Sequence, residues 1–454
     1  MSAARLPGPR SPFTHLTTGL RMLRSPYDGL IDTYRRYGPV SAVGYGPLRY
    51  VYMLGREANE FLLSTHHHLF EWREALKALI PIDGDTALVV SDGDDHARRR
   101  KLVQPAFGRR QIDSYLPVII EEAKRTVERL QQQDSADLHR EFKQAIRRIA
   151  IRTLFGDTLG DRAETIGHGL QTAIDYANLP PFLIWNRDLP FTPFRKAMRA
   201  TRVVDEIVFD EIARRRAEPG DDTDLLTVLL DASEDDDTLT DQEVRDQVVS
   251  LIAGSYETTA ALAAWTAYAV LSNPNVEDAL RADLGLLDAG PITHDGLATC
   301  SYLDAVINET LRLHGPAPFS ARYAPQAFEF LGHTIPAKST IVYSSYVTHR
   351  LPEHWTDPLV FDPRRWVDSE PPAPHVFVPF GGGYRRCIGF ALATLETKVL
   401  IAELLRSTDP VLRSRTVRPT GYATMSPKGG VHIDLPPTKC ESRPDVQDRI
   451  ELSE

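Results

Sequence analysis

Apolar side chains recur at helical spacing over most of the chain. The apolar residues between 112 and 119 fall at positions i, i+3, i+4 and i+7, which line up on one face of a helix. Similar patterns predict helices over 141–154 and 200–216. Strand-like segments are sparse and comprise residues 50–54, 328–331, 340–343 and 431–435. The pattern predicts a mainly α-helical fold with small β-sheets.

The longest predicted helix covers residues 240–272. Thr240 and Glu243 form a capping box at its start. A helix of this length would extend about 48 Å, enough to cross a whole domain. Between 248 and 271 it is apolar on nearly every face, and Glu257 is its only charged residue. A membrane span is the alternative, but a charge at mid-span and an acidic approach are costly in lipid. We therefore expect a helix buried inside a large protein.

Composition narrows the class of protein. The chain has 454 residues, 42% of them hydrophobic, and we expect one domain over 1–435 followed by a polar tail over 436–454. Its three cysteines, Cys300, Cys387 and Cys440, form no disulfide framework, which favours a reducing, cytoplasmic location. A net charge of −10 argues against a nucleic-acid-binding protein.

Two further segments concern membrane association and the surface of the protein. Residues 1–40 carry six arginines and no apolar run near the roughly 20 residues that span a bilayer, so we expect a soluble monomer without a membrane span. The acidic stretch 231–237 is interpreted as a solvated surface loop.

The segment 380–389, Phe-Gly-Gly-Gly-Tyr-Arg-Arg-Cys-Ile-Gly, concentrates unusual residues around Cys387 and leads into a helical pattern. Consecutive glycines permit a tight turn whose backbone N–H groups point at an anion such as a thiolate. A buried, unreactive cysteine is the alternative. The segment resembles the cysteine-ligand loop of the cytochrome P450 family, Phe-x-x-Gly-x-Arg-x-Cys-x-Gly, at every specified position. The resemblance extends from about residue 30 to 435.

The resemblance implies the cytochrome P450 fold, with a long helix crossing over haem b and Cys387 as the iron ligand. Phe380 belongs to the same cofactor loop. The reaction implied is insertion of one oxygen atom from O2 into a C–H bond or alkene. Within the long helix, Gly254-Ser255-Tyr256-Glu257-Thr258 resembles the family's oxygen-binding segment. It implies a cofactor-facing Gly254, a hydroxyl donor in Thr258 and a proton-relay acid in Glu257. Ser255 departs from the glycine usual there.

Two further motifs carry basic residues. His96 and Arg100 stand four apart, so both project from one side of a helix, and the resemblance implies that they bind haem propionates. It implies the same of Arg322 and Arg385. The intervening basic residues, Arg98 and Arg99, together with Lys101, are expected to stay solvated or to face a partner. Finally, the family pattern implies that Glu309, Arg312 and Arg365 form a structural network and are not catalytic.

The expected substrate is a predominantly apolar small molecule, such as a terpenoid, a steroid or a fatty-acid derivative. Its expected pocket is lined by Trp72, Leu76, Leu79, Val89, Val90, Tyr176, Leu183, Ile184, Trp185, Ala253, Phe319 and Met425. Each of these is about as often ordinary core. Electrons must come from a separate ferredoxin or flavoprotein reductase, for which the candidate docking residues are Arg109, Arg110, Arg364 and Arg386.

Two alternatives remain at this point. An enzyme of the same fold could use peroxide directly or rearrange an oxygenated substrate, although Glu257 and Thr258 favour O2 activation. A non-catalytic haem carrier or sensor offers no reason for an acid–threonine pair. A zinc site is excluded, because no Cys-x-x-Cys or histidine-rich spacing surrounds Cys387.

Overall fold

The computed structural model of the protein describes residues 6–179, 183–184, 186–220, 223–234, 237–287, 292–367 and 370–436. The α-helices of this part are α1 (Pro12–Arg24), α2 (Pro26–Tyr37), α3 (Arg56–Glu60), α4 (Arg73–Leu76), α5 (Ile80–Asp83), α6 (Gly93–Val103), α7 (Arg109–Gln131), α8 (Leu138–Phe155), α9 (Arg162–Ala177), α10 (Pro193–Ala217), α11 (Leu225–Asp231), α12 (Asp241–Leu271), α13 (Pro274–Leu284), α14 (His294–Thr299), α15 (Ser301–His314), α16 (Ser345–Thr348) and α17 (Phe390–Ser407). The strands are β1 (Val40–Val43), β2 (Tyr50–Met53), β3 (Ser135–Asp137), β4 (Ser233–Glu234), β5 (Asp237–Thr238), β6 (Ser320–Ala324), β7 (Phe328–Phe330), β8 (His333–Ile335), β9 (Ser339–Tyr343), β10 (Val411–Leu412), β11 (Pro419–Thr420), β12 (Ser426–Pro427) and β13 (His432–Asp434).

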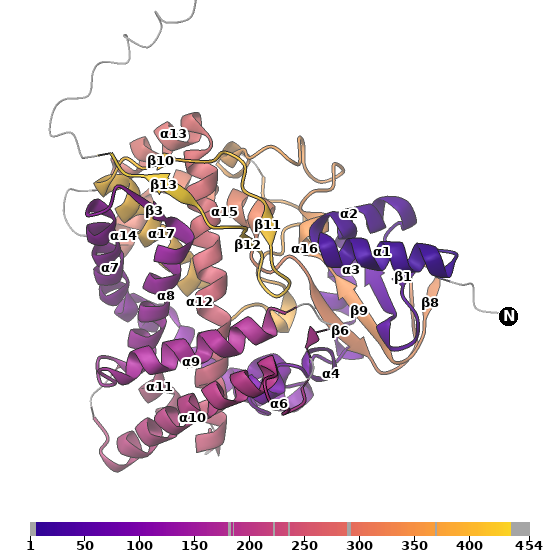
Figure 1. Ribbon diagram of the computed structural model, residues 1–454, viewed down its shortest axis with the longest axis horizontal. Coiled ribbons are helices and arrows are strands. Elements are labelled where there is room, and N and C mark those ends of the chain that lie inside the picture. The colour runs from indigo at the N-terminus through magenta and orange to yellow at the C-terminus, as the bar shows by residue number, and fades with distance from the viewer. Residues whose placement is uncertain are drawn as a thin grey trace, which may run out of the picture.

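Helices and sheets occupy different sides of the molecule. Figure 1 shows the long helices α7 to α10, α12 and α17 on one side, and the largest sheet on the other with α1, α2 and α16 beside it. That sheet has the strand order β1-β2-β9-β6, in which β2 and β9 run parallel. Helices α7, α8, α10 and α12 cover the four helical segments predicted above, so the expected mainly α-helical fold with small sheets is confirmed.

Helix α12 runs through the core. The predicted capping box is present, since the Thr240 hydroxyl accepts from the backbone N–H of Glu243 and the Glu243 carboxylate accepts in return. Trp265 is fully buried and donates from Nε1 to the carbonyl of Met425 at 3.0 Å. Its ring also stacks on His314 at 4.4 Å, which joins α12 to α15. Over the described residues, none of the helices combines the length and apolar character that a bilayer span requires.

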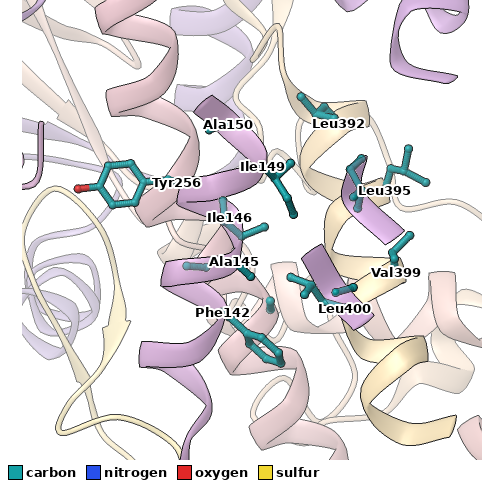
Figure 2. Close-up of a cluster of buried hydrophobic side chains, with 14 of the residues drawn as sticks. Phe142, Ala145, Ile146, Ile149, Ala150, Tyr256, Leu392, Leu395, Val399 and Leu400 are labelled. Atoms are coloured by element: carbon teal, nitrogen blue, oxygen red, sulfur yellow. The ribbon is translucent and has the colours of Figure 1, made fainter. Parts of the chain in front are cut away.

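The largest hydrophobic cluster places α8 and α17 close together. Figure 2 shows that apolar side chains of α8, among them Phe142 and Ile149, and of α17, among them Leu392 and Leu395, belong to one cluster with α12. Truncating a buried leucine of this kind costs about 2–5 kcal/mol. Because α17 begins three residues after Cys387, this packing holds the carboxyl end of the cysteine loop in place.

The acidic stretch lies at the surface as expected, with Asp231, Ser233 and Asp237 exposed, but part of it forms a short hairpin instead of a loop. Its described residues include the short strands β4 and β5, which pair with each other. Glu234 forms an ion pair with Lys101, and Asp237 forms one with Arg98. Glu243 of α12 accepts from both Arg98 and Arg99. The expectation that these basic residues are solvated is therefore wrong for Arg98 and Arg99, which intramolecular carboxylates bind. Lys101 pairs with Glu234, but its side chain remains 63% exposed.

Candidate active site

The cysteine loop is a tight turn whose backbone favours glycine at two positions. Gly381 and Gly383 have φ angles of +69° and +61°, a region that L-residues with a side chain rarely adopt. A Cβ atom added to Gly383 would lie 2.0 Å from the carbonyl oxygen of Leu63. The backbone N–H of Cys387 donates to the carbonyl of Phe380 at 2.9 Å, which closes the turn. The glycines therefore let the loop pack directly against the backbone at Leu63.

The thiol of Cys387 sits in a dense but accessible environment. The residue has substantial solvent-accessible surface, and Cys387 forms no disulfide. Burial nevertheless raises the pKa of its thiol, while the N–H of Gly389 and the positive charges of Arg100 and Arg386 act in the opposite direction. A metal cation bound to the sulfur would further offset the effect of burial on this pKa, because metal ligation favours the thiolate.

Four basic side chains converge beside this loop from three parts of the chain. Arg322 of β6 is buried, lies 3.4 Å from the ring centroid of Trp72 and donates to the Tyr343 hydroxyl at 3.1 Å. Arg100 of α6 donates to the carbonyl of Arg386 at 2.8 Å. The His96 ring contacts the ring of Tyr384, a residue of the loop, edge-on. Arg385 belongs to the loop itself and precedes Cys387 by two positions.

Positive charge exceeds negative charge in this cluster, which we name the basic cradle (His96, Arg100, Arg322 and Arg385). Within the described part of the chain, the one carboxylate paired with it is Asp92, at 2.8 Å from Arg385. Burial and the charges of Arg385 and Arg100 lower the pKa of His96 to about 3. Burial also lowers the pKa of Arg100 and of Arg322.

Two buried nitrogen atoms of the basic cradle have no hydrogen-bond partner among the described residues. They are Nδ1 of His96 and Nε of Arg385. Buried polar atoms are almost always hydrogen-bonded in folded proteins, so unpartnered nitrogen atoms beside excess positive charge fit an anionic ligand. The two propionate carboxylates of haem have this chemistry, and the residues present fit them.

The α12 segment also has the local geometry that the motif predicts. The Thr258 hydroxyl donates to the carbonyl of Gly254 at 2.8 Å and lies 3.1 Å from that of Ser255. The Ser255 hydroxyl itself donates to Ile252, so the departure from glycine introduces no unsatisfied group. A Cβ atom added to Gly254 would meet nothing within 4 Å. This face of α12 therefore borders open space.

The acid of the motif contacts a different set of residues. Glu257 is buried and forms an ion pair with Lys143 of α8, and its Oε1 accepts from Gln171 of α9 at 3.2 Å. The Tyr256 hydroxyl donates to the same Gln171 at 2.8 Å. Sequence analysis missed Lys143 and Gln171, because their helices carry no motif and only tertiary packing brings them to α12.

The structural network takes the expected form and includes further partners. Glu309 and Arg312 are fully buried and lie 2.7 Å apart, and Arg365 donates to Glu309 at 3.0 Å. The indole of Trp366, which sequence analysis missed, also donates to Glu309, at 2.9 Å. Nearby, Nε2 of His349 accepts from the N–H of Val378, so this region connects directly to the segment before the cysteine loop.

The residues expected to line the substrate pocket lie in several different environments. Trp72 packs against Arg322 and therefore belongs to the basic cradle. Tyr176 is buried in a cluster with Phe194, which identifies it as core, whereas Leu183 is 51% exposed. Trp185 lies outside the described residues, as does Cys440.

Comparisons with known proteins agree with this geometry. The family model described as Cytochrome P450 matches residues 6–427. Cytochrome P450 139 of Mycobacterium tuberculosis is 36% identical over 90% of this chain and 97% of its own length. Cyclooctat-9-en-7-ol 5-monooxygenase of Streptomyces melanosporofaciens is 31% identical over 70% of this chain and 71% of its own. The solved structure of retinoic acid-bound cyanobacterial CYP120A1 superposes with a TM-score of 0.84 at 25% identity, covering 92% of this chain and 95% of that one. The chain belongs to the cytochrome P450 family.

Proposed function

We propose that this haem-thiolate monooxygenase inserts one oxygen atom from O2 into a predominantly apolar small molecule of the terpenoid, steroid or fatty-acid type. The observation that carries the proposal is the basic cradle beside Cys387, whose surplus of buried positive charge and unpartnered nitrogen atoms suit haem propionates. When bound, haem b supplies the chemistry that activates O2 and oxidises an unreactive carbon.

The protein residues divide the work of binding, orientation and proton delivery. We assign Cys387 as the iron ligand, with Phe380 closing its loop, and His96, Arg100, Arg322 and Arg385 as propionate ligands. Thr258 is assigned the proton donor toward the open face of α12, since its hydroxyl is already oriented by the carbonyl of Gly254.

Glu257 is assigned the acid that supplies protons to this region. Its partner Lys143 is 28% exposed and therefore reaches solvent, which offers a route for protons into an otherwise buried site. The carboxylate would exchange its contact with Lys143 for one toward Thr258 during turnover.

Two relatives support an apolar substrate by their names. One is named for its action on cyclooctat-9-en-7-ol, and the superposed structure holds retinoic acid. Both compounds are rich in carbon and poor in polar atoms. The apolar side chains Val90 and Met425 of this chain, both buried, are consistent with a dry pocket of that type.

We propose that a separate ferredoxin or flavoprotein supplies the electrons to a monomeric enzyme in the cytoplasm. Arg109, Arg110 and Arg386 are exposed and would attract an acidic partner. Arg364 is 82% exposed and binds Asp362, so it contributes less net charge. Replacing Arg109 and Arg110 by glutamate should slow reduction, and an unchanged rate would exclude these two residues.

A substrate panel tests the proposal. Terpenes, steroids and lipids would be screened for a low-spin to high-spin absorbance change, followed by product analysis with NADPH and a surrogate ferredoxin and reductase. We expect binding and a product carrying one added oxygen. The Thr258→Ala variant should consume electrons without matching product, while Thr266→Ala, elsewhere in α12, should remain coupled. Full coupling in Thr258→Ala would favour peroxide use, and no product with any reductase would favour a haem carrier.

A further inference from the structure

Asp92 stands at the start of α6, but its side chain does not cap that helix. An aspartate at the N-cap position ordinarily accepts from a backbone N–H in the first turn, and Asp92 makes no such bond. Its carboxylate accepts instead from the backbone N–H groups of Trp72 and Arg73, at distances of 2.9–3.0 Å. It also accepts from Nη2 of Arg385 at 2.8 Å. The carboxylate therefore binds groups outside its own helix.

The contacts with Trp72 and Arg73 join the two ends of segment 72–92. Helices α4 and α5 and several of the residues expected to line the substrate pocket belong to this segment. The residue before it is attached to β6, since Glu71 and Tyr323 exchange both of their backbone hydrogen bonds. Figure 1 shows α4 next to β6. Asp92 thus fastens one end of the segment to the other at a point that the sheet already holds.

Arg385 connects the same segment to the cysteine loop. Its Nη1 donates to the carbonyl of Leu88 at 3.1 Å, and its Nη2 donates to the carbonyl of Ser91 as well as to Asp92. Its Nε is buried and has no partner among the described residues. Because a guanidinium is planar and rigid, holding both Nη atoms also determines where Nε points. The contacts of the Nη atoms therefore leave Nε for a different ligand.

Trp72 brings a second arginine of the basic cradle into this arrangement. The centroid of its ring lies 3.4 Å from the guanidinium carbon of Arg322 and 5.0 Å from that of Arg385. Both arginine side chains are buried, and their like charges repel each other. Asp92 binds one of the two guanidiniums and the backbone of Trp72 between them. Its carboxylate therefore offsets the repulsion and fixes the geometry of both.

We propose that Asp92 is a positioning residue for haem and acts through Arg385. The carboxylate holds the Nη side of Arg385 so that Nε is available to a propionate, and it ties segment 72–92 to the basic cradle at the same time. Haem binding and closure of the segment are coupled, because both require one orientation of Arg385. The inference rests on the proposed role of Arg385 as a propionate ligand.

A purely structural role for Asp92 gives a different pattern of effects. If the carboxylate only closes segment 72–92, its removal weakens haem retention to the same degree whether or not Arg385 is present. If it acts through Arg385, its effect on haem retention vanishes once that arginine is replaced. A double-mutant cycle separates these two cases.

The test measures transfer of haem to apomyoglobin from the wild type, Asp92→Asn, Arg385→Gln and the double variant. Asp92→Asn should release haem about tenfold faster, the equivalent of one charge-assisted hydrogen bond. In the Arg385→Gln background the same substitution should change the rate by less than about twofold. Equal acceleration in both backgrounds, or none in the wild-type background, would refute the proposal.

The reduction potential of the haem-loaded protein supplies a second readout. Asp92→Asn leaves the charge of Arg385 uncompensated, which favours the reduced cofactor, so the potential should rise. Asp95→Asn is the matched control, because Asp95 lies in the first turn of α6, is 76% exposed and reaches Arg99 only at 3.9 Å. The control should keep the wild-type potential and the wild-type rate of haem release. A rise in the control as large as in Asp92→Asn would contradict a specific role for Asp92.

Thr86→Val separates loosening of the segment from the effect on haem. The Thr86 hydroxyl donates to Asp246 of α12 at 2.7 Å, far from Arg385 along the segment. Amide hydrogen exchange over 72–92 should accelerate in both Thr86→Val and Asp92→Asn, but only Asp92→Asn should shift the potential. If every variant shows the reduced carbon monoxide maximum and Asp92→Asn shifts nothing, this inference fails while the proposed function stands. A wild type without that maximum would overturn both.

Discussion

Two of the buried clusters of charge in this protein differ in one respect. The cluster around Glu309 closes on itself, because Arg312 and Arg365 and the indole of Trp366 all donate to one carboxylate. The basic cradle around Cys387 has four cationic or potentially cationic side chains and one paired carboxylate, Asp92. A buried cluster whose polar atoms all have hydrogen-bond partners stabilises the fold, whereas one that leaves nitrogen atoms without partners, as the basic cradle leaves His96 Nδ1 and Arg385 Nε, indicates a missing ligand. The four predictions that follow separate these two roles.

Glu309→Ala should have the largest effect, lowering the free energy of unfolding by about 3–5 kcal/mol. The variant leaves two arginines and an indole without their shared acceptor in a buried site. Glu74→Ala is the matched control, because Glu74 and Lys77 form an exposed pair at the same i, i+3 spacing. The control should lose less than about 1 kcal/mol. Urea unfolding measures both, and equal losses would show that the buried network has no special structural role.

His349, next to the cluster around Glu309, should make stability depend on pH. Burial, followed by the charges of Arg350 and Arg312, lowers the pKa of His349 to about 3. Between pH 3 and 6.5 the unfolded chain binds this proton and the folded protein does not, so stability falls as the pH drops through that window. The contribution is at most about 1.4 kcal/mol per pH unit. Above pH 6.5 the His349 ring is neutral in both the folded and the unfolded chain, so the full stability is present there.

Urea unfolding between pH 7 and 4 checks the prediction for His349. His349→Gln should be less stable at pH 7, since the N–H of Val378 loses its acceptor geometry, but should show a smaller dependence on pH. His168 is 75% exposed, and His168→Gln should follow the wild-type profile. An unchanged pH profile in His349→Gln would contradict the assignment.

In the basic cradle, Arg100→Met should weaken haem retention about tenfold, the equivalent of one charge-assisted hydrogen bond. The haem-free protein should lose little stability, because the variant removes a cation that Arg385 repels. Transfer of haem to apomyoglobin measures retention, and urea unfolding of the haem-free form measures stability. A large loss of stability with normal retention would place Arg100 among the structural residues instead.

The smallest effect is expected at the surface. Asp237→Ala removes the partner of Arg98 in β5, where the aspartate side chain is 46% exposed. The free energy of unfolding should fall by less than about 1 kcal/mol, and haem retention should stay unchanged. A loss comparable to that of Glu309→Ala would mean that the hairpin of β4 and β5 supports α6 far more strongly than a surface pair can.

Sequence analysis predicted the elements whose signals are local. The capping box at Thr240, the periodicity of α7 and the glycines before Cys387 each determine backbone geometry within a few residues. It failed where partners come from distant segments. Lys143 reaches Glu257 from another helix, and Arg99 looked solvated because Glu243 is more than a hundred residues away. Such pairs depend on helix packing, which no local pattern reports.

The most direct test of the account is the absorbance spectrum of the purified protein after chemical reduction and exposure to carbon monoxide. The account predicts the long-wavelength Soret maximum that a thiolate from Cys387 produces on bound haem, and its loss in Cys387→Ser but not in Cys300→Ser. A wild-type protein that binds haem without this maximum, or a Cys387→Ser variant that retains it, would contradict the central claim that this sulfur is the iron ligand.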